Sequence, residues 1–518
     1  MDKVDLFRRD YTNDVDEVKN YEIVRKFFDM SEKGEYTLDS QTWDDLNMNK
    51  VYEKLNRTYS SPGEEVLYSM LRNPLIDEGE LKKRDKIIES FKSNSNLRER
   101  LQGIFFDLKK NRLNSFLEMI ENVLTVNKVK YYLYTFIGKI FPAIAILLGI
   151  FIDPKYLVLL LAVSGLNLLI SLKEIKEMKS NGISYLREII KAAKKIAKVK
   201  DNDIVKYTDR ITAILKQIKV IDRGTTFVDV ENMWGGFFES ISGVLLLQEC
   251  SYYAISGYIN KDKKVLLELY YLIGELEALI AVGCYQYNLS GKYAKPKFIK
   301  EISLKIKDGV HPLIDNAVPN SIFIKNTGIV LTGTNTSGKS TFLRMLGVNI
   351  LLAQTFYFTL AKSYEACFFN IVSSISPNDD LINGKSFYMA EADSILRIIT
   401  ALEKDTPVFC PIDEMFRGTN PIERISISAE ILTYLIKAKT ISIVATHDRE
   451  LTEILKKSYE FYYFSEDIDS SNGLKFDYKL KKGVSQTRNA IRLLEYMNYP
   501  KVITDSAFKR AKSIEGFI

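Results

Sequence analysis

A glycine-rich segment from Gly333 to Ser340, with the sequence GTNTSGKS, carries the clearest chemical pattern in the chain. It follows an apolar run and precedes an apolar helical pattern, so it lies where a strand turns into a helix. In that context G-x-x-x-x-G-K-S is typical of a phosphate-binding loop, because backbone N–H groups and the positive helix end face the phosphates. Lys339 would reach the β and γ phosphate oxygens, and the Ser340 hydroxyl would ligate magnesium. The alternative is a chance glycine-rich turn.

Every position of this segment is a candidate contact to a nucleotide. Asn335 can also offer its side-chain amide to a phosphate or to the attacking water, which makes it a catalytic candidate beside Lys339. The predicted nucleotide-binding residues are Gly333, Thr334, Asn335, Thr336, Ser337, Gly338, Lys339, Ser340 and Thr341.

Two adjacent carboxylates end a second apolar run, VFCPIDE, which spans residues 408–414. Asp413 would hold magnesium directly or through water, as Ser340 would, and Glu414 would orient and deprotonate the attacking water. An Asp-Glu pair alone is weak evidence, but this one follows a predicted strand 74 residues after the loop lysine. Pro411 is unusual within a strand because proline has no N–H to donate to the ladder.

A histidine ends a third predicted strand, ISIVATH, at residues 441–447. At that position His447 could sense the γ phosphate or position water, and we count it with Glu414, Lys339 and Asn335 as catalytic. A purely structural histidine is the alternative. The chain contains only one other histidine, His311.

Strands and helices alternate from about residue 297 onward, which predicts a mainly parallel sheet covered by helices with ligands at the carboxyl ends of the strands. Helices are expected over about 390–403 and 422–437. The expected strands lie in FIKEISLKI, SIFIKN, GIVLTG, ACFFNIVSSIS, PVFCPID, TISIVATH and a C-terminal segment.

Composition sets wider limits. A chain of 518 residues is too long for one core and indicates several domains. The net charge of +6 is too small to identify a partner. Four cysteines are scattered singly in apolar surroundings, which indicates buried thiols and a reducing compartment. The polar, acidic N-terminus shows no signal peptide.

Residues 131–172 contain two long apolar runs joined by Asp153-Pro154-Lys155. The first run has about 20 residues with one charge, Lys139, and the second about 17 with none, which approximates the hydrocarbon core of a bilayer. They predict a transmembrane helical hairpin. A hairpin buried in a soluble core is the alternative. Lys128 and Lys130 precede the hairpin, and Lys173, Lys176 and Lys179 follow it. By the positive-inside rule, these lysines place both termini of the chain in the cytoplasm.

The remaining segments are predicted to be helical. We expect an N-terminal arm over 1–36, a helical module over 37–130, and a helical region over 173–296 that ends at Pro296. Within it, the basic stretch 173–219 could face anionic lipid, DNA phosphates or, most commonly for such a run, solvent.

With these residues in view, the chain resembles the MutS family of DNA mismatch-repair and recombination ATPases. The resemblance rests on GTNTSGKSTFLR (333–344), SFYMAEA (386–392), IDEMFRGTNP (412–421), ATHDREL (445–451) and YKLKKGVSQTRNAI (478–491), and on RTYSSPGEEVLYSMLRNPL (57–75) as the start of a core domain. It implies an α-helical core and lever region followed by an ABC/MutS-type P-loop NTPase domain over 297–518, which uses ATP and Mg²⁺.

The resemblance also implies a homodimer with composite sites, in which Ser386 points at the nucleotide of the opposite subunit. Arg417, Gly418 and Thr419 would lie near that interface, and the helices after Ser485 would stabilise the dimer. His311-Pro312 resembles a turn that could contact adenine.

Two departures from the family pattern shape the functional prediction. The core-like module begins by about residue 37, which leaves no room for a mismatch-reading domain, and the apolar hairpin stands in the lever and clamp region. We therefore expect a short, membrane-attached form of the family: a multi-pass protein of the cell membrane whose ATPase domain is cytoplasmic and acts on DNA. The alternative is a nucleotide-switched membrane scaffold that binds protein or lipid instead of DNA.

Overall fold

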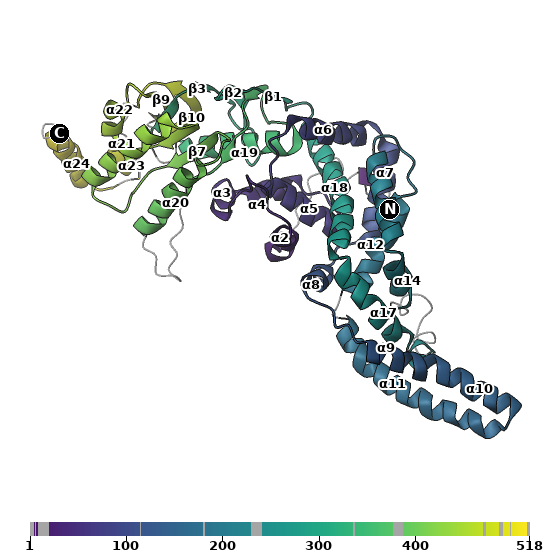
Figure 1. Ribbon diagram of the computed structural model, residues 1–518. Coiled ribbons are helices and arrows are strands. Elements are labelled where there is room, and N and C mark those ends of the chain that lie inside the picture. Colours follow the sequence, from purple (N-terminus) through teal and green to yellow (C-terminus); the bar gives the residue numbers. More distant parts are fainter. Residues whose placement is uncertain are drawn as a thin grey trace. The chain divides into compact units, whose positions relative to one another are not determined.

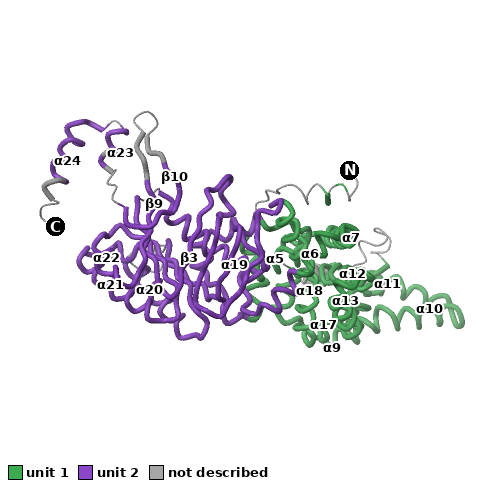
Figure 2. The backbone as a smooth tube through the Cα atoms, turned by 90° about the horizontal axis from the view of Figure 1, so that it is seen from above, with its two compact units in different colours: residues 1–32, 55–70, 86–288 green, residues 33–54, 71–85, 289–518 purple. Residues whose placement is uncertain are grey.

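The computed structural model describes residues 5, 7–8, 20–113, 115–179, 182–228, 241–334, 337–376, 387–469, 473–485, 490–497 and 499–514. The chain forms two compact units (Figure 2). Unit 1 comprises residues 1–32, 55–70 and 86–288, and unit 2 comprises residues 33–54, 71–85 and 289–518. Residues 37–130, expected as one helical module, are thus divided between both units.

Every regular element in the described part of unit 1 is a helix (Figure 1). The long helix α18 (Lys263–Asn288) is buried over most of its length, which explains its nearly continuous apolar sequence. The other helices are α2 (Tyr21–Met30), α7 (Ser95–Leu108), α8 (Ser115–Glu121), α9 (Lys128–Thr135), α10 (Phe141–Phe151), α11 (Leu157–Lys179), α12 (Ile183–Ile196), α13 (Val205–Gln217), α14 (Lys219–Val228) and α17 (Leu247–Lys261), while α5 (Ser61–Arg72) and α6 (Glu78–Ser93) run from one unit into the other.

Helix α18 carries a buried carboxylate, Glu277, that is 2% exposed. It accepts hydrogen bonds from the backbone N–H groups of Tyr59 and Ser60 and from the Ser60 hydroxyl, so it holds the turn that precedes α5. Gly63 is required beside it, because a Cβ there would lie 2.1 Å from Glu277 Oε2. Burial raises the pKa of Glu277 from 4.5 to about 7.

This carboxylate predicts a pH dependence of stability. Between about pH 4.5 and about pH 7 the folded chain keeps the Glu277 proton that the unfolded chain has lost. The contribution of Glu277 to the free energy of unfolding is therefore largest below pH 4.5 and falls by about 3 kcal/mol as the pH rises to 7. Glu277→Gln should flatten this dependence in urea unfolding followed by circular dichroism. The control Glu118→Gln, at an exposed position of α8, should keep it. An unchanged slope in Glu277→Gln would contradict the account.

The two apolar runs form a helical hairpin, as the sequence predicts. A short π-helix, η1 (Phe136–Ile140), joins α9 to α10, and a 3₁₀ turn, η2 (Pro154–Tyr156), leads into α11. The two arms lie side by side (Figure 1). Over their most apolar windows only 22% of the first arm, Lys128–Phe151, and 11% of the second, Pro154–Glu174, is buried.

The described residues of unit 2 form two sheets. The larger has the strand order β10-β9-β4-β8-β7-β6, and all its pairs are parallel except β10 with β9, which confirms the mainly parallel sheet. Its strands are β4 (Gly328–Thr332), β6 (Asn370–Ile371), β7 (Val408–Asp413), β8 (Thr440–Ala445), β9 (Tyr459–Asp469) and β10 (Gly473–Lys482).

The smaller sheet, with the order β1-β5-β2-β3, is mostly antiparallel. It consists of β1 (Pro296–Phe298), β2 (Ser303–Gly309), β3 (Asn320–Lys325) and β5 (Ser363–Ala366). Helix α19 (Lys339–Phe356) contacts β2 of this sheet and β7 and β8 of the larger one, so it is buried on nearly all sides. On the larger sheet, α20 (Phe387–Ala401) and α21 (Pro421–Lys437) share a core with β7 and β8.

The remaining helices described in this unit have between 6 and 14 residues. They are α3 (Ser40–Asp45), α4 (Met48–Leu55), α22 (Arg449–Ile454), α23 (Ala490–Tyr496) and α24 (Lys501–Ile514). The four cysteines are free and buried, as their apolar surroundings predict.

Two local features differ from a simple strand pattern. The expected strand ACFFNIVSSIS is interrupted: its first residue ends β5 of the smaller sheet, and Asn370–Ile371 form β6 of the larger one. Between them, the Gln354 side-chain amide accepts a hydrogen bond from the N–H of Phe369 and donates one to its C=O, each at 2.8 Å. These two backbone groups are therefore not available for pairing with a neighbouring strand. Pro411 lies in the middle of β7. Because proline has no N–H, the pairing of β7 with β6 stops after Ile371. The two segments pair again at a single bridge between Ser374 and Ile412.

Candidate functional site

The β4–α19 loop turns sharply at two glycines. Gly333 has φ 133° and Gly338 has φ 107°, values that favour glycine. A Cβ on Gly333 would also lie 2.8 Å from the carbonyl oxygen of Phe464. Helix α19 then begins at Lys339, so its N-terminal N–H groups are directed to the end of β4, as the sequence predicts.

The lysine of this loop is 2% exposed and folds over the loop itself. Lys339 Nζ donates to the carbonyl oxygens of Gly333 at 2.7 Å and Thr334 at 2.9 Å. It also lies 3.4 Å from His447 Nε2. These contacts place a positive charge beside the loop backbone, where a phosphate oxygen would be recognised.

A hydroxyl and a carboxylate meet at the carboxyl end of β7. Ser340, in the first turn of α19, hydrogen-bonds Asp413, the last residue of β7. Hydroxyl and carboxylate oxygens are ligands that Mg²⁺ prefers, so this donor set fits the predicted metal pair.

Glu414 follows β7 in a left-handed conformation, with φ 56°. Its N–H bonds the carbonyl of Ala445 at 2.9 Å, which fixes the turn against β8. Its carboxylate lies 3.1 Å from His447 Nε2 and 2.7 Å from Arg417 Nε. The hydrogen bond from His447 and the charge of Arg417 lower the pKa of Glu414 although burial opposes them. The carboxylate is therefore ionised at neutral pH.

His447 comes from the loop after β8, where Thr446 N bonds the Leu331 carbonyl at 3.0 Å. The structure thus brings Lys339, Ser340, Asp413, Glu414 and His447 together at one edge of the larger sheet. Because Nε2 faces the carboxylate of Glu414, the tautomer that fits carries its proton on that nitrogen.

Glu391 of α20 is a supporting residue that the sequence analysis did not single out. It is 3% exposed and accepts hydrogen bonds from the N–H groups of Arg417 at 3.0 Å and Gly418 at 3.4 Å. It therefore holds the loop that carries the partner of Glu414. Its position inside the SFYMAEA motif was the available signal.

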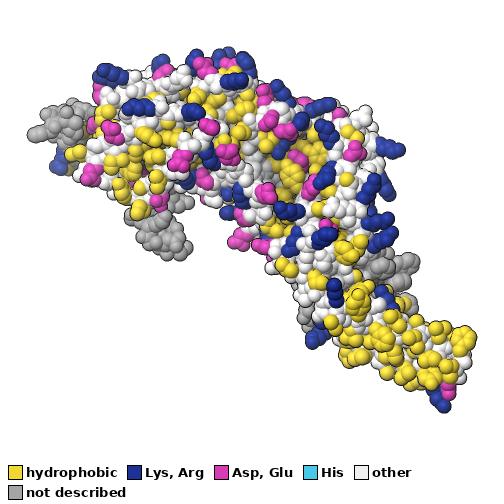
Figure 3. Space-filling model, in the orientation of Figure 1, with side chains coloured by type: hydrophobic (Ala, Val, Ile, Leu, Met, Phe, Trp, Pro, Cys, Tyr) yellow, Lys and Arg dark blue, Asp and Glu magenta, His cyan; other side chains and the backbone are white. Residues whose placement is uncertain are grey.

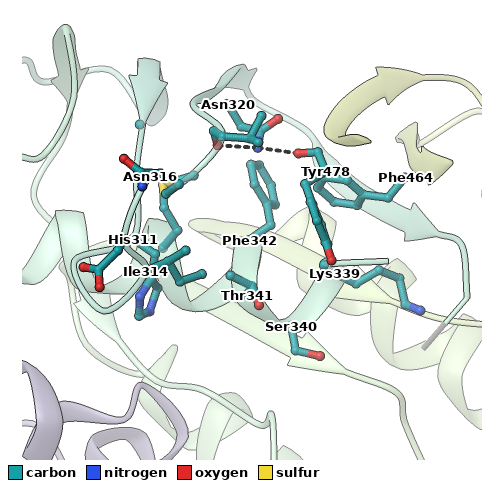
Figure 4. Close-up of a pocket in the computed structure, with 16 residues that line it drawn as sticks. His311, Ile314, Asn316, Asn320, Lys339, Ser340, Thr341, Phe342, Phe464 and Tyr478 are labelled. Atoms are coloured by element: carbon teal, nitrogen blue, oxygen red, sulfur yellow. Dashed lines mark hydrogen bonds between the residues drawn. The ribbon is translucent and has the colours of Figure 1, made fainter. Parts of the chain in front are cut away.

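A cavity of about 600 Å³ opens beside the N-terminus of α19 (Figure 4). Thr341 and Phe342 of α19 line it, together with Tyr478 of β10. His311 lies on the other side, near Ile314. Other lining residues come from the loop after His311, from the start of β3 and from β9. Sequence periodicity did not identify them: Asp315, Asn316, Ala317, Val318, Asn320 and Phe464.

His311 is 6% exposed. Burial, with the nearby charges of Arg344 and Lys54, lowers its pKa to about 4, so the imidazole is neutral. Its Nδ1 accepts the N–H of Leu313 at 3.2 Å, which leaves the proton on Nε2. Among the described residues, Nε2 has no hydrogen-bond partner.

Some predicted residues cannot be placed. Asn335, Thr336 and Ser386 lie outside the described residues. Residues 486–489, at the start of the segment predicted to stabilise the dimer, also lie outside them. Ser337 is described, and its hydroxyl donates to the Thr334 carbonyl at 2.7 Å, so it supports the loop conformation.

Comparison with known proteins gives consistent matches. The sequence model of MutS domain V matches residues 329–515. DNA mismatch repair protein MutS of Thermotoga maritima is 31% identical over 261 residues, which cover 48% of this chain and 32% of that protein. The MutS protein of Finegoldia magna is 25% identical over 526 residues, which cover 90% of this chain and 59% of that protein.

The chain therefore spans between about a third and three-fifths of the length of these relatives. The matched segment 329–515 contains the β4–α19 loop, Asp413, Glu414 and His447, and the longer match extends into the helical part of the chain. Residues 329–515 are therefore matched by the MutS family, and the chain is similar to a MutS protein over 90% of its length.

Proposed function

We propose that this chain is a Mg²⁺-dependent ATPase that is held in a membrane and works as a dimer on DNA. The MutS family consists of ATPases that use Mg²⁺ and work as dimers on DNA. The observation that supports ATP hydrolysis in this chain is the meeting of Lys339, Ser340, Asp413 and Glu414 at the carboxyl edge of a parallel sheet. The test is phosphate release from ATP by the purified protein, which should require Mg²⁺ and cease in EDTA.

Each side chain then has a separate task. Ser340 and Asp413 would hold Mg²⁺, which when bound neutralises charge on the β and γ phosphate oxygens. Lys339 exchanges its loop carbonyls for phosphate oxygens. Glu414 orients the attacking water and accepts its proton, and His447 holds the Glu414 carboxylate in place.

The cavity beside α19 has the size and lining for a nucleoside. Phe342, Phe464 and Tyr478 offer aromatic surface to a flat base. We place the adenine ring here, against these aromatic side chains.

The hairpin supports membrane attachment. Apolar side chains cover the visible face of α10 and α11 (Figure 3). Leu161 is 76% exposed and Phe151 is 79% exposed, which does not fit the alternative of a hairpin buried in a soluble core. A bilayer would cover these side chains and leave the segments that precede and follow the hairpin on the same side.

Two arginines should disrupt this attachment. In Leu147→Arg/Leu161→Arg each hairpin arm gains a charge, at a cost of about 3 kcal/mol each if the arms lie in hydrocarbon. The wild type should stay with membranes in alkaline carbonate, and the variant should be released. The matched control Leu113→Arg/Val123→Arg changes two residues outside the hairpin that are at least as exposed, and it should stay bound. Release of the wild type would contradict membrane insertion.

DNA is the proposed partner of the dimer because the curated relatives are DNA mismatch repair proteins. The alternative remains a nucleotide-switched scaffold that binds protein or lipid. Retention on homoduplex, mismatched and branched DNA at several salt concentrations separates the two, since phosphate contacts weaken steeply with salt. Nucleotide-dependent retention supports the DNA role, and its absence with intact ATPase activity supports the scaffold.

A further inference from the structure

Helix α3 (Ser40–Asp45) lies outside the matched segment 329–515 but packs within unit 2. Its last residue, Asp45, is 1% exposed. The Asp45 carboxylate accepts hydrogen bonds from Ser373 Oγ at 2.6 Å, Ile375 N at 2.9 Å and Ser376 N at 2.8 Å. A buried carboxylate requires such donors, so Asp45 fixes the shape of the turn at residues 373–376.

The same helix also holds α20. Gln41 donates to Ser394 at 2.6 Å, and Asp39 pairs with Arg397. Arg397 in turn donates to the Ser373 carbonyl at 2.6 Å. Turn 373–376 and helix α20 flank the segment 377–386 in the sequence, and that segment ends with Ser386. Both flanks of the segment are therefore attached to α3.

A third set of contacts reaches α19, which carries Lys339 and Ser340. Arg344, one turn beyond Ser340, donates from Nε to the Asp45 carbonyl at 2.7 Å and from Nη2 to Ser376 Oγ at 3.3 Å. The packing is close, since a Cβ on Gly347 would lie 2.6 Å from a methyl group of Leu46. A shift of α19 would therefore move Asp45 and its turn together.

We propose that α3 couples helix α19 to the two flanks of the segment that carries Ser386, and that Asp45 is the positioning residue of this connection. The proposal rests on the proposed function, because it takes nucleotide binding at α19 as its input. It adds Asp45, a residue far from the β4–α19 loop in the sequence, through which occupancy of the nucleotide site would reach turn 373–376 and helix α20. Packed side chains and hydrogen-bond networks can carry such coupling, and the contacts of α3 with α19, with turn 373–376 and with α20 form such a network.

The test uses Asp45→Asn in the 518-residue chain, with ATP affinity and turnover measured separately. Asparagine keeps the size and one acceptor oxygen, so ATP affinity should stay within about twofold while turnover falls about tenfold. The matched control Asp44→Asn, at an exposed position of the same helix, should behave as wild type. Equal losses of affinity, turnover and thermal stability would indicate a structural role alone and overturn the proposal.

Two further measurements keep the proposal testable if Asp45→Asn folds poorly. Ser373→Ala removes one donor to Asp45 and should lower turnover in the same direction, and the double variant should fall no further than Asp45→Asn alone. In hydrogen exchange, ATP should slow the amides of residues 40–46 in the wild type but not in Asp45→Asn. Wild-type protein that binds no ATP contradicts the proposed function. ATP binding with equal exchange in both proteins contradicts the coupling alone.

Discussion

Glu414→Gln should bind ATP as the wild type does but lower turnover by about 100-fold or more, the usual contribution of a general base. Glutamine can still accept a hydrogen bond from His447 Nε2, so the surrounding loop should keep its arrangement. It cannot accept the proton of the attacking water. Steady-state phosphate release and equilibrium ATP binding, measured on the same preparation, separate the two effects.

The control for this variant is Glu430→Gln, an exposed glutamate on α21 that should leave both measurements unchanged. Because the pKa of Glu414 lies below its ordinary value of 4.5, the base stays ionised as the pH falls from 7 to 5. Wild-type turnover should therefore show no loss from protonation of this group in that range. Full turnover in Glu414→Gln would remove it from the role of base.

Lys339→Met should weaken ATP binding by about 100-fold or more, since hydrogen bonds to a charged group contribute about 1.5–3 kcal/mol each. In the structure the ammonium makes two such bonds to loop carbonyls, which phosphate oxygens would replace. Methionine fills the buried space without the charge. Equilibrium binding of ATP in Mg²⁺ measures the loss.

Lys362→Met is the matched control, because Lys362 is an exposed lysine of the same unit. It should bind ATP as the wild type does. A small effect of Lys339→Met, with the protein folded, would mean that phosphate is recognised elsewhere.

The sequence predicted the secondary structure around the candidate site, because glycine spacing and strand-ending polar residues leave a direct signal. The loop at Gly333–Ser340 and the carboxylates Asp413 and Glu414 are of this kind. The parallel larger sheet then brought Ser340 to Asp413 and His447 to Glu414. The nucleotide and metal roles of these residues remain proposals.

Features that depend on tertiary contact were not predictable in the same way. Gln354 interrupts an expected strand only because α19 packs against Phe369. The cavity takes Phe464 and Tyr478 from strands far along the chain, and Asp45 reaches residues more than 300 positions away. The division into two units was not predictable either, because each unit is built from several separate segments of the chain. Helices α5 and α6 run from one unit into the other, so no change in amino-acid composition marks the boundary.

The most direct test of the central claim is photo-crosslinking of an azido-adenine analogue of ATP, followed by mapping of the labelled peptides. If ATP lies at the β4–α19 loop with its base in the cavity, label should appear on residues 309–320 or on the segments around Phe464 and Tyr478. Excess ATP and Lys339→Met should both abolish it. Saturable label elsewhere in the chain, or no saturable label at all, would contradict the account.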